Sequence, residues 1–375
     1  MSKNKHRVLH LMTGFGGGIS AFILNKAEEL VNSDIEFNVL TFDEVSDRFR
    51  EAVENTGGSI YKISDPEQTN QFKMMKDYIK VLNQFDRDVI IHSHFGMNLV
   101  VPFYFLAKIK GVKRFVIHAH TGAPYRLNDK KRKLNRYFGK EKVSAGIKCS
   151  ENIFGKDSAR NDAIMHIPNS INPDKYLTPI SDEQKLKIKL FGEENINKKI
   201  IGHVGRFHSV KNHEFMLNLV EELAKTDKDF LWVFVGDGDL RDEIEQEVVT
   251  RNLSPFVKFM GWQNDTSLFF KLFDLFILPS FYEGLPTVAI ESQAAGTPTL
   301  LSDTITDEVD LDLGLLKFLD LENMKDWIDT IKNPMFSNPS VDTRRKVLID
   351  KKFTNDKSAE LYRDFIKENI KSYII

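Results

Sequence analysis

The strongest constraint on the fold is an alternation of short apolar runs with longer amphipathic stretches along nearly the whole chain. Such alternation is typical of strand–helix units that build a parallel sheet. One segment interrupts it, Pro168-Asn169-Ser170-Ile171-Asn172-Pro173, with Pro179 just beyond. At roughly 150 residues per domain, the chain of 375 residues is long enough for two domains. We therefore predict two consecutive doubly wound α/β domains joined at this segment.

The first domain is expected to span 1–170 and the second 171–354, with a separate amphipathic helix at the end of the chain, within 355–375. The strands expected in the first domain are Arg7–Met12, Phe37–Phe42, Ser59–Ile63, Asp88–His92, Arg114–His118, Gly146–Cys149 and Ala163–Ile167. Those expected in the second are Ile200–Val204, Leu231–Val235, Val257–Met260, Leu275–Leu278 and Thr299–Leu301. Because ligands of open α/β sheets bind beyond the carboxyl ends of the strands, we expect the chemistry in strand-to-helix loops facing a cleft between the domains.

Composition narrows the function classes. The 52 Lys and Arg residues nearly balance the 54 Asp and Glu residues, so we expect no nucleic-acid partner. The single cysteine, Cys149, excludes an intrachain disulfide and fits a cytoplasmic location. The longest apolar run, Leu99–Ala107, contains Pro102 and is far shorter than the roughly 20 residues of a membrane span. An integral membrane protein is therefore not expected.

A glycine-rich loop, Thr13-Gly14-Phe15-Gly16-Gly17-Gly18-Ile19-Ser20, follows the first expected strand. Glycines there allow close backbone approach and leave amide N–H groups free for an anion at a helix N-terminus. The spacing is not that of the dinucleotide-binding fingerprint, because its third glycine would fall at Ile19. The alternative is a tight turn without a ligand.

Two cations follow the first strand of the second domain, Arg206 and Lys211 within Gly205–His213. An arginine fork and a mobile lysine ammonium together suit a diphosphate. A solvated charge pair is the alternative, but the position directly after a strand favours the functional interpretation.

Two glutamates lie in the segment Phe281–Glu291: Glu283 in the expected loop and Glu291 inside the following helix, which Pro286 begins. A carboxylate among apolar helix residues needs a partner, and the two hydroxyls of a sugar or ribose could supply one. A pair of glutamates also occurs in glycosidases, so the spacing alone leaves both possibilities open.

Several motifs together resemble those of retaining glycosyltransferases of family 4. Those in the second half are Glu283-Gly284-Leu285-Pro286-Thr287-Val288-Ala289-Ile290-Glu291, Gly205-Arg206-Phe207, Lys211-Asn212-His213, Val235-Gly236-Asp237-Gly238 and Phe259-Met260-Gly261. Those in the first half are Ile90–Phe95, His118-Ala119-His120 and Ile167–Ile171, with Ser170 in place of the family's usual glycine. The segment Ser302–Val309 is similar to the branch that builds capsular polysaccharides and exopolysaccharides.

This resemblance implies a GT-B fold, two Rossmann-like domains facing a cleft, with the C-terminal helix crossing back to the first domain. It implies a nucleoside-diphosphate sugar, a UDP-sugar, as donor, a saccharide on a polyprenyl diphosphate as acceptor, and no metal or other cofactor. The implied donor-binding residues are Gly16, Gly17, Arg206, Lys211, Met260, Gln263, Glu283, Gly284, Leu285, Pro286, Thr287 and Glu291. Within this set Arg206 and Lys211 would hold the diphosphate, Glu291 the ribose and Glu283 the sugar.

The resemblance also implies an active-site histidine, either His118 or His120. We expect their side chains to point to opposite sides of the strand end, so that only one lines the cleft. His120 is favoured because it is followed directly by Thr121-Gly122. His118 is then expected to pack behind the strand, and the same opposition is expected of His92 and His94.

Positive charge is concentrated in Arg126–Lys148, notably at Lys130, Lys131, Arg132, Lys133 and Arg136. Such a run with interleaved aromatics suits peripheral docking on anionic lipid at the inner face of the plasma membrane, although a solvated surface and RNA binding are alternatives. For the chain as a whole, a nucleotide-sugar epimerase of the same fold, a dinucleotide oxidoreductase and a non-enzymatic sugar-binding protein also stay open.

Overall fold

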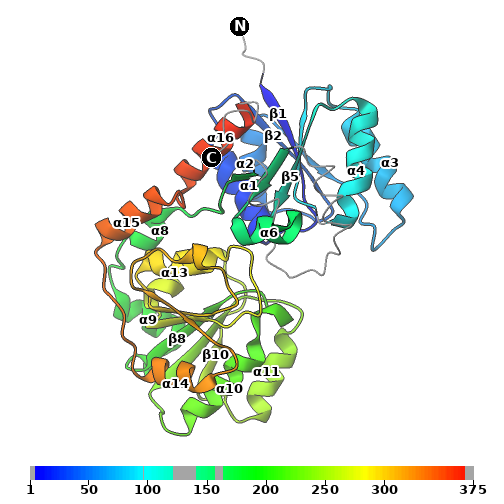
Figure 1. Ribbon diagram of the computed structural model, residues 1–375. Helices are drawn as coiled ribbons and strands as arrows, with labels where there is room; N and C mark the ends of the chain where they lie inside the picture. The colour runs from blue at the N-terminus through cyan, green and yellow to red at the C-terminus, as the bar shows by residue number, and fades with distance from the viewer. Residues whose placement is uncertain (1–4, 96, 121–140, 157–163, 368–375) are drawn as a thin grey trace. The chain divides into compact units, whose positions relative to one another are not determined.

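The computed structural model describes residues 5–95, 97–120, 141–156 and 164–367. The chain divides into two compact units, one formed by 1–171 with 352–375 and the other by 172–351. Each unit is a Rossmann-like α/β domain around one parallel sheet (Figure 1). In the described part of the chain, no helix is long and apolar enough to cross a membrane.

The sheet of the first unit has the strand order β3-β2-β1-β4-β5-β6-β7, and all its pairs are parallel. The strands are β1 His6–Leu11, β2 Ile35–Thr41, β3 Ile60–Lys62, β4 Ile90–Ser93, β5 Arg114–Ala119, β6 Glu141–Ser144 and β7 Ile164–His166. The order reverses between β1 and β4, the kind of position at which ligands of such sheets bind.

The helices of this unit are α1 Gly18–Glu29, α2 Asp47–Asn55, α3 Gln71–Leu82, α4 Met97–Lys110, α6 Ile147–Phe154 and, from the end of the chain, α16 Asn355–Lys367. Helix α16 packs against α1 (Figure 1). Its apolar side belongs to the same core as Phe22 of α1, because Tyr362 and Phe365 are buried there. A segment from the far end of the sequence thus completes the core of the first unit.

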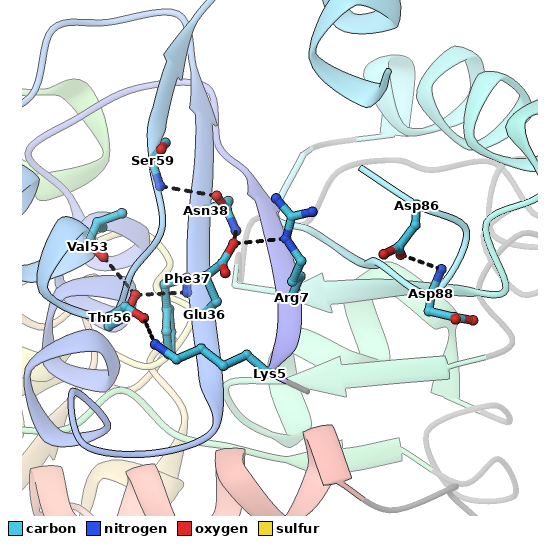
Figure 2. A network of polar contacts seen from close by, with 10 residues as sticks. All are labelled: Lys5, Arg7, Glu36, Phe37, Asn38, Val53, Thr56, Ser59, Asp86 and Asp88. Carbon is cyan, nitrogen blue, oxygen red and sulfur yellow. Dashed lines mark hydrogen bonds and ion pairs between the residues drawn. The ribbon is translucent and has the colours of Figure 1, made fainter. Parts of the chain in front are cut away.

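A polar network fixes the start of this sheet (Figure 2). The Thr56 hydroxyl, which is fully buried, donates to the Val53 carbonyl at 2.7 Å and accepts from the Phe37 amide at 3.0 Å. The Thr56 carbonyl accepts from the Lys5 ammonium at 2.7 Å. Since buried polar groups are costly without partners, these bonds hold the end of α2 in a defined place on β2.

One expected strand of this unit is wrong. Gly146–Cys149 is not a strand but the start of α6, and the strand β6 lies just before it. Gly146 is the extended residue that precedes the helix, and Cys149, Ile153 and Phe154 form its buried face. Cys149 and Ile153 are four residues apart, and residues four apart share one side of a helix. The apolar residues of this segment are therefore spaced as in a helix, although a short apolar run is also compatible with a strand.

The second unit contains a parallel sheet of order β10-β9-β8-β11-β12-β13. Its strands are β8 Lys199–Val204, β9 Phe230–Val235, β10 Val257–Phe259, β11 Leu275–Leu278, β12 Thr299–Ser302 and β13 Leu316–Leu319. Its α-helices are α8 Pro173–Leu177, α9 Glu183–Phe191, α10 His213–Ala224, α11 Arg241–Thr250, α12 Ser267–Leu272, α13 Thr287–Ala295, α14 Met324–Lys332 and α15 Val341–Asp350. The edge strand β13 was not predicted, because its four residues are only partly buried or exposed and include Lys317.

Candidate active site

Two loops of the second unit meet because the strands before them are neighbours. Strands β8 and β11 pair directly, so the loops that leave their carboxyl ends run side by side. The Phe281 amide, in the loop after β11, donates to the Val210 carbonyl, in the loop after β8, at 2.9 Å. This bond brings the residues that follow, Lys211 and Glu283, to the same place.

The Lys211 ammonium lies 2.6 Å from Glu283 Oε1, and the two side chains are only 18% and 14% exposed. An ion pair partly shielded from water is stronger than one on the surface. Lys211 is predicted to bind a diphosphate and Glu283 a sugar, and in the structure these two side chains pair with each other. A ligand that binds either group therefore competes with this ion pair.

Arg206 has a different partner. Its guanidinium donates to Asp239 Oδ2 at 3.3 Å, and the two side chains are 69% and 74% exposed. Such pairs contribute little to stability, so the guanidinium is free to take a stronger anionic partner. Helix α11 begins after Leu240 without a side-chain cap, so neither Asp237 nor Asp239 caps it.

His203 is a buried histidine of β8, directly before the loop that contains Arg206 and Lys211, and it was not singled out in the sequence. His203 Nδ1 lies 2.9 Å from the Ile277 carbonyl, which can only accept, so Nδ1 carries the proton and Nε2 the lone pair. Burial lowers the pKa of His203 well below its usual value. A Cβ at Gly205 would lie 3.0 Å from His203 Nε2. The only signal in the sequence is a histidine inside an otherwise apolar strand.

Glu291 is held in α13 by hydroxyl groups. Burial raises the pKa of its carboxyl to about 7, while hydrogen bonds from Tyr176 and Thr266 oppose that shift. Tyr176 comes from α8, which was not predicted. The carboxyl group is therefore close to its own midpoint of titration at neutral pH, and its charge responds to any partner that it acquires.

The segment Gly284–Thr287 forms the entry to α13. Pro286 is the residue before the helix and has extended backbone angles, and no side chain caps the first turn. Leu285 is buried and anchors the loop. The amides of a first turn without a side-chain cap can donate hydrogen bonds to an anion. Here these amides directly follow the loop that contains Glu283.

The loop after β10 contains Met260 and Gln263. The Gln263 side chain donates to the Met260 carbonyl at 2.8 Å, and Gly261 has a φ of 65°, so the loop is held in one shape. Trp262 in this loop is 59% exposed and was not singled out in the sequence. An exposed tryptophan offers an aromatic face to a planar ligand, and its place after a strand was the available signal.

Two amides of the glycine-rich loop of the first unit, which we expected to be free for an anion, have a partner within the chain. The amides of Gly16 and Gly17 both donate to Ser20 Oγ, at 3.1 and 3.0 Å. The side chain of Ser20 thus caps α1 from within and uses two of the donors assigned to an anion. Gly16 has a φ of 93°, a conformation that favours glycine.

The prediction that the side chains of His118 and His120 point to opposite sides of the strand end is wrong. Their ring centroids are 3.8 Å apart, because residues two apart along a strand point to the same side. His92 and His94 likewise stack, with ring centroids 4.6 Å apart. His118 is buried and His120 is partly buried, so neither packs behind the strand away from the other.

Ser170, which departs from the pattern of the resembled family, is itself a buried contact. Its hydroxyl lies 3.0 Å from the ammonium of Lys26, and its carbonyl accepts from the Asn25 side chain at 2.8 Å. Burial lowers the pKa of Lys26 to about 7. The serine thus ties this segment to α1.

The basic residues Lys130, Lys131, Arg132, Lys133 and Arg136 lie outside the described residues.

Two family models match the chain: "Glycosyltransferase Family 4" over 16–175 and "Glycosyl transferases group 1" over 185–307. The chain is 31% identical over 344 residues to EpsF of Bacillus subtilis, which is named as a glycosyltransferase, and the match covers 88% of each protein. The chain belongs to glycosyltransferase family 4.

Two further comparisons bear on this glycosyltransferase. It is 31% identical, over 143 residues that cover 37% of the chain and 36% of the relative, to UDP-Gal:alpha-D-GlcNAc-diphosphoundecaprenol alpha-1,3-galactosyltransferase of Escherichia coli. Its structure matches HepE of Anabaena, solved in complex with UDP and glucose, with a TM-score of 0.74 and 16% identity, covering 96% of this chain and 98% of HepE. The glycosyltransferase therefore has the GT-B fold predicted from its sequence.

Proposed function

We propose that this glycosyltransferase moves a sugar from a UDP-sugar to a saccharide acceptor carried on a polyprenyl diphosphate, with retention of anomeric configuration, in the synthesis of capsular polysaccharide or exopolysaccharide. The observation that carries the proposal is the ion pair of Lys211 and Glu283 beside the uncapped start of α13. It combines a cation for phosphate, a carboxylate for sugar hydroxyls and a set of backbone donors in one place.

Each part of the donor has a proposed contact. Lys211 and Arg206 bind the diphosphate together with the amides of Gly284–Thr287, and Glu283 binds the sugar. Glu291 binds the ribose hydroxyls, and the loop Met260–Gln263 binds the base. From the first unit, His120 contacts the sugar, and Gly16 and Gly17 allow close approach of the backbone.

The proposed chemistry uses charge stabilisation. As the bond between the anomeric carbon and the diphosphate oxygen breaks, negative charge grows on the leaving diphosphate, and Lys211, Arg206 and the α13 amides stabilise it. The acceptor hydroxyl attacks from the face that the diphosphate leaves, and its proton passes to the departing phosphate oxygen. We propose that these cations and dipoles suffice without a metal ion; loss of activity in excess EDTA that Mn²⁺ restores would contradict this.

The relatives support this choice of substrates. The E. coli relative is named for a UDP-sugar donor and a diphosphoundecaprenol-linked acceptor, and HepE was solved with UDP. EpsF, the relative matched over most of its length, supports the glycosyltransferase activity itself.

We also propose peripheral contact with an anionic membrane. The basic segment around Lys130–Lys133 suggests it, and the first unit also exposes two large apolar side chains on α3 and α4, Phe72 at 88% and Ile109 at 81%. Exposed apolar and basic groups together favour an anionic lipid surface. Reversing the charges of Lys130–Lys133 is expected to reduce binding to anionic liposomes in a salt-dependent way, and unchanged binding would contradict the proposal.

The proposed function is tested by incubating the purified protein with a panel of nucleotide sugars, with and without a polyprenyl-diphosphate saccharide. We expect one UDP-sugar to be consumed with the acceptor present, and NMR of the product to show the donor's anomeric configuration. Consumption that needs no acceptor would indicate an epimerase. Sugar binding with no affinity for nucleotide would indicate a binding protein, and an inverted product would contradict retention.

A further inference from the structure

Two neighbouring strands of the first unit each end in a His-x-His sequence. His92 lies in β4 and His94 directly after it, and His118 lies in β5 and His120 directly after it. Residues two apart along a strand point to the same side, and β4 and β5 pair with each other in parallel. The four rings therefore gather at the carboxyl ends of two adjacent strands, where ligands of open α/β sheets bind.

Three of these histidines are spaced as metal ligands are. One ring nitrogen from each of His94, His118 and His120 lies within 4.8 Å of the other two. His94 and His118 are buried, and His120 is partly buried. The group is thus shielded from water except at His120.

Two nitrogen atoms of this group are buried without a hydrogen-bond partner among the described residues, His118 Nε2 and His120 Nδ1. A buried polar atom without a partner is costly, and a metal ion is a partner for a nitrogen lone pair. His10, His92 and His94 are spaced as closely, but both ring nitrogens of each already form hydrogen bonds within the cluster. The available nitrogens therefore select the group that contains His118 and His120.

Two further histidines orient the rings of this group. His94 Nε2 lies 3.0 Å from His10 Nδ1, and His118 Nδ1 lies 3.1 Å from His92 Nε2. A metal-binding histidine commonly donates its other N–H to an acceptor, which fixes the orientation of its ring. These two contacts leave Nδ1 of His94 and Nε2 of His118 for an ion.

Tyr362 of α16 supports both of these acceptors. Its hydroxyl oxygen lies 3.1 Å from His10 Nε2 and 3.4 Å from His92 Nδ1. A hydroxyl oxygen has two lone pairs, so it can accept a hydrogen bond from each of these two rings at once. His10 and His92 then both present a lone pair to the ligand rings, and all four of these hydrogen bonds are kept.

His120 supplies the third nitrogen through Nε2, which lies 2.7 Å from His94 Nδ1. When His94 Nε2 donates to His10, His94 Nδ1 has a lone pair and accepts this bond from His120 Nε2. An ion bound to both nitrogens replaces the bond, and the proton moves from Nε2 to Nδ1 of His120. All three ligand rings remain neutral.

The ligand atoms determine which ions suit the site. Imidazole nitrogen suits zinc, copper and nickel, whereas magnesium, calcium and manganese prefer oxygen ligands. In the part of the chain that the structure describes, these rings form hydrogen bonds to histidine and tyrosine and to no carboxylate. Three histidines hold zinc in sites that keep a fourth position for water or another ligand.

We propose that His94, His118 and His120 together bind one zinc ion. His10 and His92 are positioning residues, because each holds the ring of one ligand. The bound ion occupies His120 and thereby inhibits the enzyme. The inhibition rests on the proposed function, which assigns His120 to the donor sugar, whereas the binding of zinc does not.

Binding is tested by calorimetric titration of zinc into the full-length protein after removal of metals, for wild type, His94→Gln and His118→Gln. We expect one zinc ion per chain in wild type and an affinity at least about tenfold weaker in each variant, since changes even around a metal ligand cost that much. The control, His6→Gln, removes a partly buried histidine of β1 and should bind zinc as wild type does. No binding to wild type, or unchanged binding in both ligand variants, would overturn the proposal.

A measurement on wild type alone makes the test independent of the folding of the variants. Cobalt bound in a tetrahedral nitrogen site absorbs visible light strongly, whereas octahedral cobalt on a protein surface absorbs weakly. We expect strong bands from one cobalt ion per chain, which zinc abolishes and excess magnesium does not. Weak bands alone would overturn the proposal.

Activity separates this proposal from the proposed function. Zinc at about ten times its dissociation constant should raise the KM for the donor about tenfold by mass action, without lowering kcat, and EDTA should reverse the effect. Zinc binding with no change in KM would overturn the inhibition and the place of His120 in the donor site, but not the zinc site. Transfer from a UDP-sugar by a protein that binds no zinc would overturn the zinc site and support the proposed function.

Discussion

The ammonium of Lys211 and the carboxylate of Glu283 are 2.6 Å apart although 72 positions separate them in the sequence. Each is the other's partly buried counter-ion, and each was assigned on sequence grounds to a different part of one ligand. Removing either side chain therefore leaves an unpaired charge as well as a lost ligand contact.

The first prediction concerns the strength of this pair. Lys211→Ala and Glu283→Ala are each expected to lower the free energy of unfolding by about 1–3 kcal/mol, and the double variant by less than their sum, because the second truncation removes a charge already unpaired. Urea unfolding of the four proteins measures this. The exposed pair Lys62 and Glu44 provides the control, for which the effects of the two truncations should be additive. Additive effects at Lys211 and Glu283 would contradict the prediction.

The second prediction concerns pH. The pKa of Glu291 in the folded protein is raised to about 7 from an ordinary 4.5, so the folded state holds this proton more tightly than the unfolded chain. Stability from this group is present below pH 4.5 and is lost as the pH rises through 7. Relative to Glu291→Gln, the wild type should lose on the order of 2–3 kcal/mol of unfolding free energy between pH 4 and pH 8. A constant difference between the two proteins would contradict this.

The third prediction follows from the same group. If the ionised carboxylate of Glu291 accepts hydrogen bonds from a ribose, UDP affinity should rise with pH through about 7. In Glu291→Gln only the pH dependence that comes from the ionisation of the UDP phosphate, with a pKa of about 6, should remain, because glutamine does not ionise. Titration calorimetry at pH 6 and pH 8 makes the comparison, and an equal pH dependence in both proteins would assign the effect to another group.

The fourth prediction concerns the backbone beneath the site. Gly236 has a φ of 139°, and a Cβ there would lie 2.0 Å from the Gly205 carbonyl oxygen. Since backbone cannot move aside as a side chain can, Gly236→Ala should cost about 2–4 kcal/mol of unfolding free energy. Gly17→Ala is the control for stability, because a Cβ there meets nothing within 4 Å. Similar unfolding midpoints for the two variants would contradict the prediction.

Local patterns predicted many of the elements well. Helix α2 at Asp47–Asn55 has a serine cap and an apolar stripe, both of which are visible in the sequence, and β11 is a continuous apolar run with the expected bounds. These elements are determined by residues close together in the sequence. The short edge strand β13 has neither signal, and α6 was mistaken for a strand because its apolar run is compatible with both.

The site was predicted less completely because its contacts join distant segments. Lys211, Glu283 and Glu291 were singled out, but neither the ion pair between Lys211 and Glu283 nor the contact of Glu291 with Tyr176 was predicted. Tyr176 reaches Glu291 from a five-residue helix, and Tyr362 joins His10 from 352 positions away. Such contacts depend on the register of strands and the packing of helices, which periodicity alone does not fix.

The account depends on the binding of a nucleoside diphosphate at Lys211, and calorimetric titration of UDP into wild type and Lys211→Ala tests this most directly. Lys225→Ala, in an exposed ion pair of the same unit, is the control. We predict that Lys211→Ala weakens UDP binding by about tenfold or more, the effect of losing a charge-assisted contact, while Lys225→Ala does not. Equal affinity for UDP in all three proteins would contradict the account.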